Sequence, residues 1–263
     1  MASFELLNNV DHLGVKIRTE RSLELGDNQM FCLSFPAEFR AAQAYYPILF
    51  YKDGQTGQFM PVLLLGFQSG ENLFVQQQSW QAGYLPLDMA RQPFTIGLQH
   101  GERVIHIDTA HPRVSDSSGE PLFLAFGGQS PYLQQVAEQL ETLHHGIVDG
   151  KNFSQQLLEL ELIESFVLDV TLNHGQQHSL HGFYTINEPR LAQLSGEHLA
   201  QLQQAGYLEA IYMMLASQSQ FARLIGFKNQ LLLLNLFVNR RHILAQALRL
   251  PKRISTQILI FEI

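Results

Sequence analysis

The stretch Ile48–Gly66, with the sequence ILFYKDGQTGQFMPVLLLG, decides the fold class. Two apolar runs, Ile48–Lys52 and Phe59–Gly66, flank the dipeptide Asp53-Gly54. Because Asp-Gly tolerates the positive φ angles of tight turns, this pattern predicts a β-hairpin. We therefore expect an antiparallel, hairpin-rich sheet in the first half of the chain.

Other segments repeat this pattern on both sides of that stretch. Thr95–Gln99 and Arg103–Ile107 flank a turn at His100-Gly101 and predict a second hairpin. In the second half, apolar residues alternate along Phe166–Leu172, which predicts a strand with one apolar face, paired with Ser179–Ile186. Two further short strands are expected at His12–Ile17 and Met30–Phe35.

Helix signals dominate the rest of the second half. Ser130, followed by Pro131, is suited to cap a helix, and Asn152, Asn187 and Ser195 are further candidate caps. Gly206 occupies a position where left-handed backbone geometry ends a helix. The chain is therefore predicted to be α+β: an antiparallel hairpin-rich sheet in the first half, and helices plus one β-hairpin in the second.

The charge of the chain is uneven. Its formal net charge is −7, with 11 − 23 = −12 in residues 1–226 and 6 − 1 = +5 in residues 227–263. An acidic body repels polyanions, so nucleic acid is not expected as a ligand. We expect one α+β domain over residues 1–229, with a sub-division near 149–152, and a basic, apolar tail over residues 230–263.

The chain begins without a basic, apolar leader, and no apolar run approaches the length of a membrane span. A cytoplasmic location is the resulting expectation. The single cysteine, Cys32, excludes an intrachain disulfide, and its large apolar neighbours predict an inert core residue.

Common catalytic signatures are absent, including the dinucleotide-binding, phosphate-loop, nucleophile-elbow and zinc-protease motifs. We therefore expect no cofactor. One alternative stays open, because His106 and Asp108 lie two apart on a predicted strand and face the same side. With a later histidine (His174, His178 or His181) they would form the ligand set of a non-haem iron oxygenase.

A segment rich in turns and aromatic residues is the main candidate for a binding site. It runs from Glu71 and Asn72 through Trp80 and Tyr84 to Arg91. Tryptophan and tyrosine combine an apolar body with one hydrogen-bond donor, which suits ligand or peptide contacts. Arg91 is expected to pair with Glu71 or with an external carboxylate. The alternative is a rigid loop packed over the sheet by its own aromatic side chains.

Several motifs together resemble the SapC family of bacterial proteins. They include Gly70-Glu71-Asn72-Leu73-Phe74, Trp80 to Pro86 leading into Arg91-Gln92-Pro93-Phe94, and Gly182 to Glu188. The likeness runs from about His12 to about Asn229. It implies an association with bacterial surface-layer or nutrient-uptake systems, and it brings no catalytic residues with it.

The expected function is therefore that of a non-enzymatic accessory or binding protein with a protein or peptide partner. Its ligand would contact Glu71, Asn72, Trp80, Tyr84 and Arg91. The alternative is the iron oxygenase described above, or a partner of such an enzyme.

Overall fold

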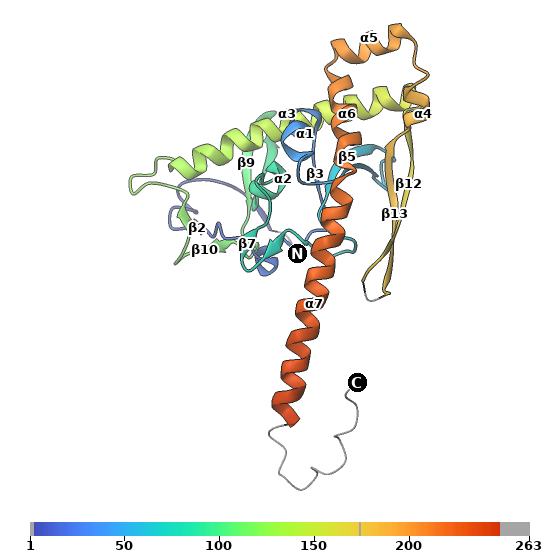
Figure 1. The fold of residues 1–263 in the computed structure, drawn as a ribbon. Helices are drawn as coiled ribbons and strands as arrows, with labels where there is room; N and C mark the ends of the chain where they lie inside the picture. Colours follow the sequence, from blue (N-terminus) through green and yellow to red (C-terminus); the bar gives the residue numbers. More distant parts are fainter. Residues whose placement is uncertain (1–2, 174, 248–263) are drawn as a thin grey trace, which may run out of the picture.

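The computed structural model describes residues 3–173 and 175–247 and combines helices with antiparallel sheets (Figure 1). The largest sheet has the strand order β12-β13-β4-β5-β3, and all neighbouring strands are antiparallel. Its strands are β3 (Phe31–Leu33), β4 (Ile48–Lys52), β5 (Phe59–Leu64), β12 (Ile163–Thr171) and β13 (Gln177–Ile186). The two hairpins predicted at these places are confirmed, and β13 joins them by pairing with β4.

A second sheet has the order β1-β9-β8 and contains the other predicted hairpin. Its strands are β1 (Phe4–Leu6), β8 (Phe94–Gln99) and β9 (Glu102–Asp108). The smaller pairings involve β2 (Lys16–Ile17), β6 (Val75–Gln76), β7 (Ser79–Trp80), β10 (Val114–Ser115) and β11 (Glu120–Pro121). The strand expected over His12–Ile17 is limited to the two residues of β2.

The helices are α1 (Pro36–Ala42), α2 (Leu87–Ala90), α3 (Pro131–Glu159), α4 (Glu188–Leu191), α5 (Gly196–Gln204), α6 (Tyr207–Ser217) and α7 (Gln220–Ala247), with a 3-10 turn at Leu23–Leu25. Three predicted caps are confirmed: Ser130, Asn187 and Ser195 each accept a hydrogen bond from a backbone N–H of the following turn. Gly206 has a φ of 77° and separates α5 from α6.

The predicted helix start at Asn152 is wrong, because Asp149–Asn152 lie inside α3. This helix has 29 residues and passes through Gly146 and Gly150 without interruption. Gly146 is needed there, since a Cβ atom would lie 2.4 Å from the ring of Phe35. The glycine thus serves close packing, and no linker divides the chain at residues 149–152.

Two buried clusters form the core, and α3 contributes to both. Phe153 and Leu157 belong to the larger cluster beneath the five-stranded sheet. Val136 and Leu140 belong to a smaller cluster with Ile107 of β9. Figure 1 shows α3 extending across the molecule between these regions.

The last helix, α7, begins in the core and then leaves the body of the molecule (Figure 1). Phe221 and Leu224 are buried, whereas Leu233 and Leu234 are exposed. The predicted boundary at residue 229 therefore falls within one continuous helix. Within the residues described, none of the helices is both long and apolar enough to cross a bilayer. The end of the predicted tail, residues 248–263, lies outside the described residues.

Candidate functional site

Trp80 and Tyr84, two residues of the predicted site, are connected by hydrogen bonds through Tyr46 of the core. Trp80 Nε1 donates a hydrogen bond to the Tyr46 hydroxyl oxygen at 2.7 Å. The Tyr46 hydroxyl in turn donates to the carbonyl oxygen of Tyr84. Burial raises the pKa of Tyr46 far above its usual value, so its phenol stays protonated and keeps donating even in alkaline solution.

The chain of contacts continues to Glu38, a buried carboxyl group that sequence reasoning missed. Glu38 accepts hydrogen bonds from Ser34 Oγ at 2.6 Å, from the Tyr84 hydroxyl at 2.7 Å and from the backbone N–H of Leu87 at 2.9 Å. Burial raises the pKa of Glu38, and these hydrogen bonds oppose that rise. The phenol of Tyr84 is therefore engaged inside the fold.

Arg91 is held by Asp88 and not by Glu71, so the predicted pair is wrong. Its Nε donates to Asp88 Oδ1 at 2.8 Å, and its Nη1 donates to the carbonyl oxygen of Phe94 at 2.7 Å. Asp88 also accepts from the backbone N–H of Leu33, which ties this pair to β3. Neighbouring Cys32 is buried, and burial raises the pKa of its thiol well above the usual value. A protonated, buried thiol is unreactive.

Glu71 forms a buried ion pair with Lys228, on the first turns of α7. Glu71 Oε1 accepts from Lys228 Nζ, and Glu71 Oε2 accepts from the backbone N–H of Phe67 at 2.9 Å. The side chains of Glu71 and Lys228 are 9% and 7% exposed. The two charges are 157 positions apart, so the pair fastens α7 to the loop after β5.

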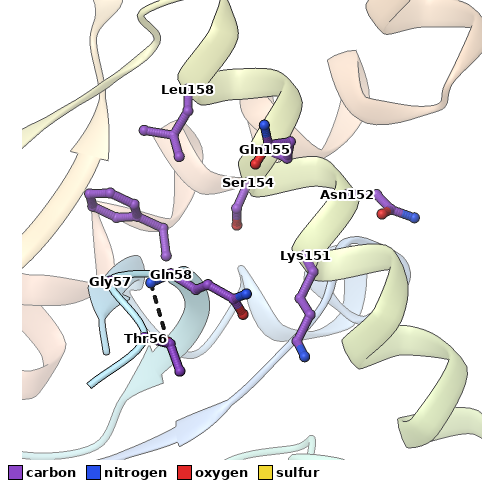
Figure 2. Close-up of a pocket in the computed structure, with 9 residues that line it drawn as sticks. Thr56, Gly57, Gln58, Lys151, Asn152, Ser154, Gln155 and Leu158 are labelled. Carbon is purple, nitrogen blue, oxygen red and sulfur yellow. Dashed lines mark hydrogen bonds between the residues drawn. The ribbon is translucent and has the colours of Figure 1, made fainter. Parts of the chain in front are cut away.

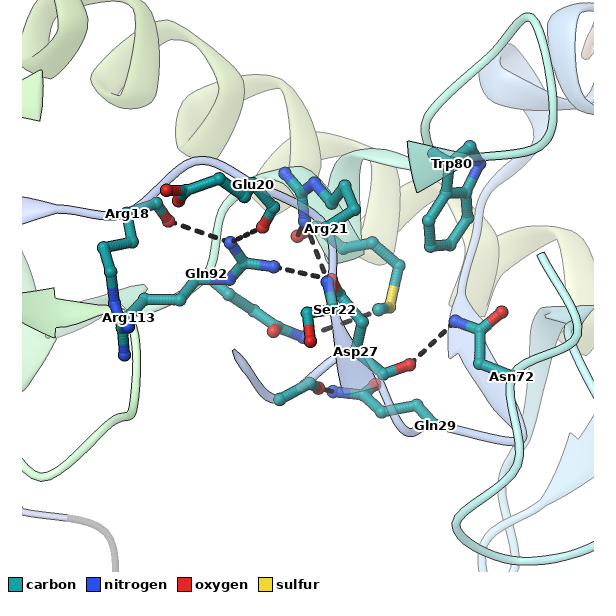
Figure 3. Close-up of polar contacts among 12 residues, drawn as sticks. Arg18, Glu20, Arg21, Ser22, Asp27, Gln29, Asn72, Trp80, Gln92 and Arg113 are labelled. Atoms are coloured by element: carbon teal, nitrogen blue, oxygen red, sulfur yellow. Dashed lines mark hydrogen bonds and ion pairs between the residues drawn. The ribbon is translucent and has the colours of Figure 1, made fainter. Parts of the chain in front are cut away.

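Asn72 connects the same loop to a buried charge cluster (Figure 3). Its Nδ2 donates to the carbonyl oxygen of Asp27 at 2.8 Å, and its Oδ1 accepts from the backbone N–H of Phe74 at 3.0 Å. Both polar ends of the buried amide are therefore satisfied within the fold.

Asp27 lies between two arginines at the centre of this cluster. It accepts from Arg113 Nη2 at 2.7 Å and from Arg21 Nη1 at 3.2 Å. Arg113 is 1% exposed, and its Nη1 also donates to the carbonyl oxygens of Arg18 and Glu20, as Figure 3 shows. Arg113 thus fixes the segment from Arg18 to Asp27 against the body.

The five residues predicted to bind a ligand therefore each have a hydrogen-bond partner inside the fold. Sequence reasoning missed their partners (Glu38, Asp88, Lys228 and Asp27) because the pairs are mostly far apart along the chain. Arg91 also lines a pocket of about 140 Å³, together with His144 and apolar side chains of β8 and α3.

The residues proposed for the metal alternative lie on β9, with His106 opposite Leu6 and Asp108 opposite Phe4. Asp108 Oδ1 accepts from the backbone N–H of Ser3 at 2.8 Å. His178 and His181 lie on β13, in the other sheet. In residues 3–173 and 175–247, no three His, Cys, Asp or Glu side chains come together as a metal site. His174 lies outside the described residues.

An open pocket of about 290 Å³ lies between α3 and the turn that joins β4 to β5 (Figure 2). The side chains of Gln58, Lys151, Asn152 and Gln155 line it, with Leu158 on one wall. Gln155 Nε2 donates to Glu159, and Ser154 Oγ donates to the carbonyl oxygen of Gly150. The lining is thus mixed, with the apolar side chains of Phe59 and Leu158 beside the polar ones.

A second feature of the surface is apolar. The Asn9 side chain donates to the carbonyl oxygen of Gly127 at 3.0 Å, which brings residues 4–13 beside the loop 123–129. We call these two segments the N-terminal face. Val10 is 82% exposed and Phe126 is fully exposed on it. Other large apolar side chains on it are also exposed: Phe4, Leu6, Leu13 and Leu124.

A groove of about 350 Å³ runs along the N-terminal face. Its lining comes from Leu6, Leu7, Asn8, Asn9, Val104, Ile105, Phe123, Gly127, Gln129 and Leu133. The only charged residues within residues 3–13 are Glu5 and Asp11. The face is thus an apolar surface with an acidic margin.

Comparison with known proteins places the chain in a family. A sequence profile of the SapC family matches residues 7–224, a range that begins just after β1 and extends into the first turns of α7. No curated protein and no solved structure matches the chain. The chain belongs to the SapC family.

Proposed function

We propose that the chain is a non-enzymatic binding protein whose N-terminal face docks a protein partner. Following what the family resemblance implies, it would serve a bacterial surface-layer or nutrient-uptake system. The cytoplasmic location expected from the sequence is part of this proposal.

The exposed apolar side chains of the N-terminal face carry the proposal. Burying such side chains on folding would have stabilised the chain, yet Val10 and Phe126 remain in solvent. Contiguous exposed apolar surface with a polar margin is typical of sites that contact other proteins. Phe126 is the most exposed of these side chains and is the best candidate for an anchor that fills a partner's pocket.

The contacts of residues 71–91 agree with a binding scaffold. Trp80, Tyr84 and Arg91 direct their donors to groups of the fold, so they hold the loop rigid. This supports a role in which these residues shape the protein and an exposed face makes the contact.

Charge substitution on the N-terminal face tests the proposal. Phe126→Asp and Val10→Asp should fold normally, because both side chains are exposed, and should lose the proteins that co-purify with the tagged chain from its bacterial cells. Leu98→Asp is the matched control. Leu98 is 74% exposed and lies on β8, at the edge of the sheet β1-β9-β8 that is opposite β1. Equal recovery of co-purifying proteins from all three variants would refute the proposal.

The same assay tests the site expected from the sequence. If Arg91→Gln removes the co-purifying proteins while Phe126→Asp retains them, the partner binds beside Arg91 and not on the N-terminal face.

A further inference from the structure

The edge of the N-terminal face is a strand with an unpaired side. In the sheet order β1-β9-β8, β1 has β9 on one side and no described strand on the other. Leu7 donates its backbone N–H to Ile105, and Ser3 accepts from the backbone N–H of Thr109. Because hydrogen bonding alternates along antiparallel strands, Ser3, Glu5 and Leu7 face β9. The backbone N–H groups of Phe4 and Leu6 therefore point away from the sheet. The outward carbonyl oxygen of Leu6 accepts from Asn8 Nδ2 at 3.3 Å, within the same segment.

The side chains of β1 alternate in chemistry. Phe4 and Leu6 lie on one face and are 55% and 37% exposed. Glu5 lies on the other face, and its side chain is 52% exposed. Glu5 Oε1 accepts a hydrogen bond from Thr109 Oγ1 at 2.9 Å, and Glu5 Oε2 lies 3.8 Å from His12 Nε2. The alternate residues of a strand added beside β1 would lie next to the apolar side chains of Phe4 and Leu6 on one face and next to the carboxylate of Glu5 on the other.

We propose that the partner of this chain presents an extended segment that adds to the free edge of β1, with apolar and basic residues in alternation. This inference rests on the proposed function and specifies its ligand. Apolar residues of the segment pack beside Phe4 and Leu6 and reach the groove of about 350 Å³. The intervening basic residue pairs with Glu5. In such strand addition, main-chain hydrogen bonds supply affinity and side-chain contacts supply specificity.

The charge of the body favours this partner over a second copy of the chain. Residues 1–226 have a net charge of −12, and residues 3–13 contribute two carboxylates and no lysine or arginine. Pairing two β1 strands from different copies would bring these like charges together. A basic segment meets the opposite charge.

A short synthetic peptide in which valine and lysine alternate is the probe. We expect it to bind the full chain in fluorescence anisotropy, and the peptide in which valine and glutamate alternate to bind at least about fivefold more weakly. Reversing the charge by Glu5→Lys should invert this preference. Methylating alternate backbone nitrogens of the valine–lysine peptide should abolish its binding.

A pair of variants isolates the backbone contribution. Phe4→Pro removes the N–H that points outward and leaves the pairing of Ser3 and Glu5 with β9 in place, since proline is tolerated at strand edges. Phe4→Ala removes the same side chain but keeps the N–H. Phe4→Pro should bind the peptide at least about fivefold more weakly than Phe4→Ala. Circular dichroism of both variants confirms that they are folded.

The outcomes separate this inference from the proposed function. If Phe126→Asp abolishes recovery of the cellular partner but Phe4→Pro and Phe4→Ala bind the peptide equally, the face is an interface and strand addition is wrong. If the valine–lysine peptide does not bind at all, the inference also fails. Concentration-dependent dimerisation in sedimentation, lost in Phe4→Pro, would assign the edge to a second copy and overturn the choice of a basic partner.

Discussion

Replacing Lys228 by methionine removes one half of the buried ion pair that holds α7. The substitution keeps the length and apolar packing of the side chain and deletes its charge. Glu71 then stays in a site where its side chain is 9% exposed, with the Phe67 backbone N–H at 2.9 Å as its remaining donor. An unpaired buried carboxylate is costly, so the variant should be destabilised.

The expected loss is about 3–5 kcal/mol, the range measured when one member of a buried pair is removed. For a chain of this size, each 1 kcal/mol lowers the melting temperature by roughly 2–4 °C, so the shift should be roughly 6–20 °C. Urea denaturation followed by circular dichroism measures the free energy of unfolding, and calorimetry measures the melting temperature.

A double-mutant cycle shows whether the charge is the cause. Adding Glu71→Leu to Lys228→Met should recover most of the stability, because no uncompensated charge remains. The matched control is Arg40→Met, which breaks the pair between Arg40 and Glu209; those side chains are 73% and 52% exposed. It should cost about 0–1 kcal/mol. If Lys228→Met costs no more than Arg40→Met, the pair does not fasten α7 to the body.

Three further predictions concern the core and the end of the chain. The pKa of Glu38 is raised above the ordinary 4.5 in the folded state, so its contribution to stability is present below pH 4.5 and is lost as the pH rises through the folded pKa. The uncharged variant Glu38→Gln should therefore gain stability relative to the wild type as the pH increases, as measured by urea titration at several pH values. Parallel plots of unfolding free energy against pH for the two proteins would contradict this. Gly146→Ala should lower the melting temperature, because the new Cβ would lie 2.4 Å from the Phe35 ring. Gly226→Ala, whose Cβ would have no atom within 4 Å, should raise the stability by up to about 1 kcal/mol. Equal effects of the two substitutions would show that Phe35 moves aside. Truncation after Asn229 keeps Lys228 and should leave the melting transition of the body nearly unchanged and improve its solubility; failure to fold would place the later residues in the core.

Local patterns carried the prediction of the elements. The hairpin at Ile48–Gly66 forms as predicted, but the positive φ angle of its turn is at Gly57 (70°) and not at Asp53-Gly54. Asp53 instead fixes the turn through its Oδ1, which accepts from the backbone N–H groups of Gln55 and Thr56. The cap at Ser130 is also a local matter, since its hydroxyl accepts from Leu133 three residues later.

Long-range pairing was out of reach of the same reasoning. The contact between β13 and β4, through Tyr184 and Phe50, unites strands from both halves of the chain, and neither strand encodes its partner. The error at Asn152 has a similar origin: asparagine is a common helix cap, but α3 continues through Asn152, and at Gly150 it lies close to Pro61 and Phe35. Tertiary packing overrode a local signal there.

The candidate site divides in the same way. Sequence reasoning located the loop that contains Trp80 and Arg91 but not the inward hydrogen bond of Trp80, because Tyr46 lies 34 positions away. The partner of Arg91, Asp88, is only three positions away and was a local pair that the sequence offered. The free edge of β1 is likewise defined by pairing with β9, about a hundred residues away. It follows that surface availability, which decides function, was the property least accessible to the sequence.

The 29-residue helix α3 has a consequence for how the molecule unfolds. At 1.5 Å per residue it is roughly 43 Å long, and its two ends lie in different cores. If either core opens, one end of α3 loses its packing, and the helix is then less well held against the other core. Sub-global opening of one half alone should therefore be rare. We therefore expect the amide protons of Leu140 and Leu157 to exchange with solvent at similar, slow rates, through one opening event common to both.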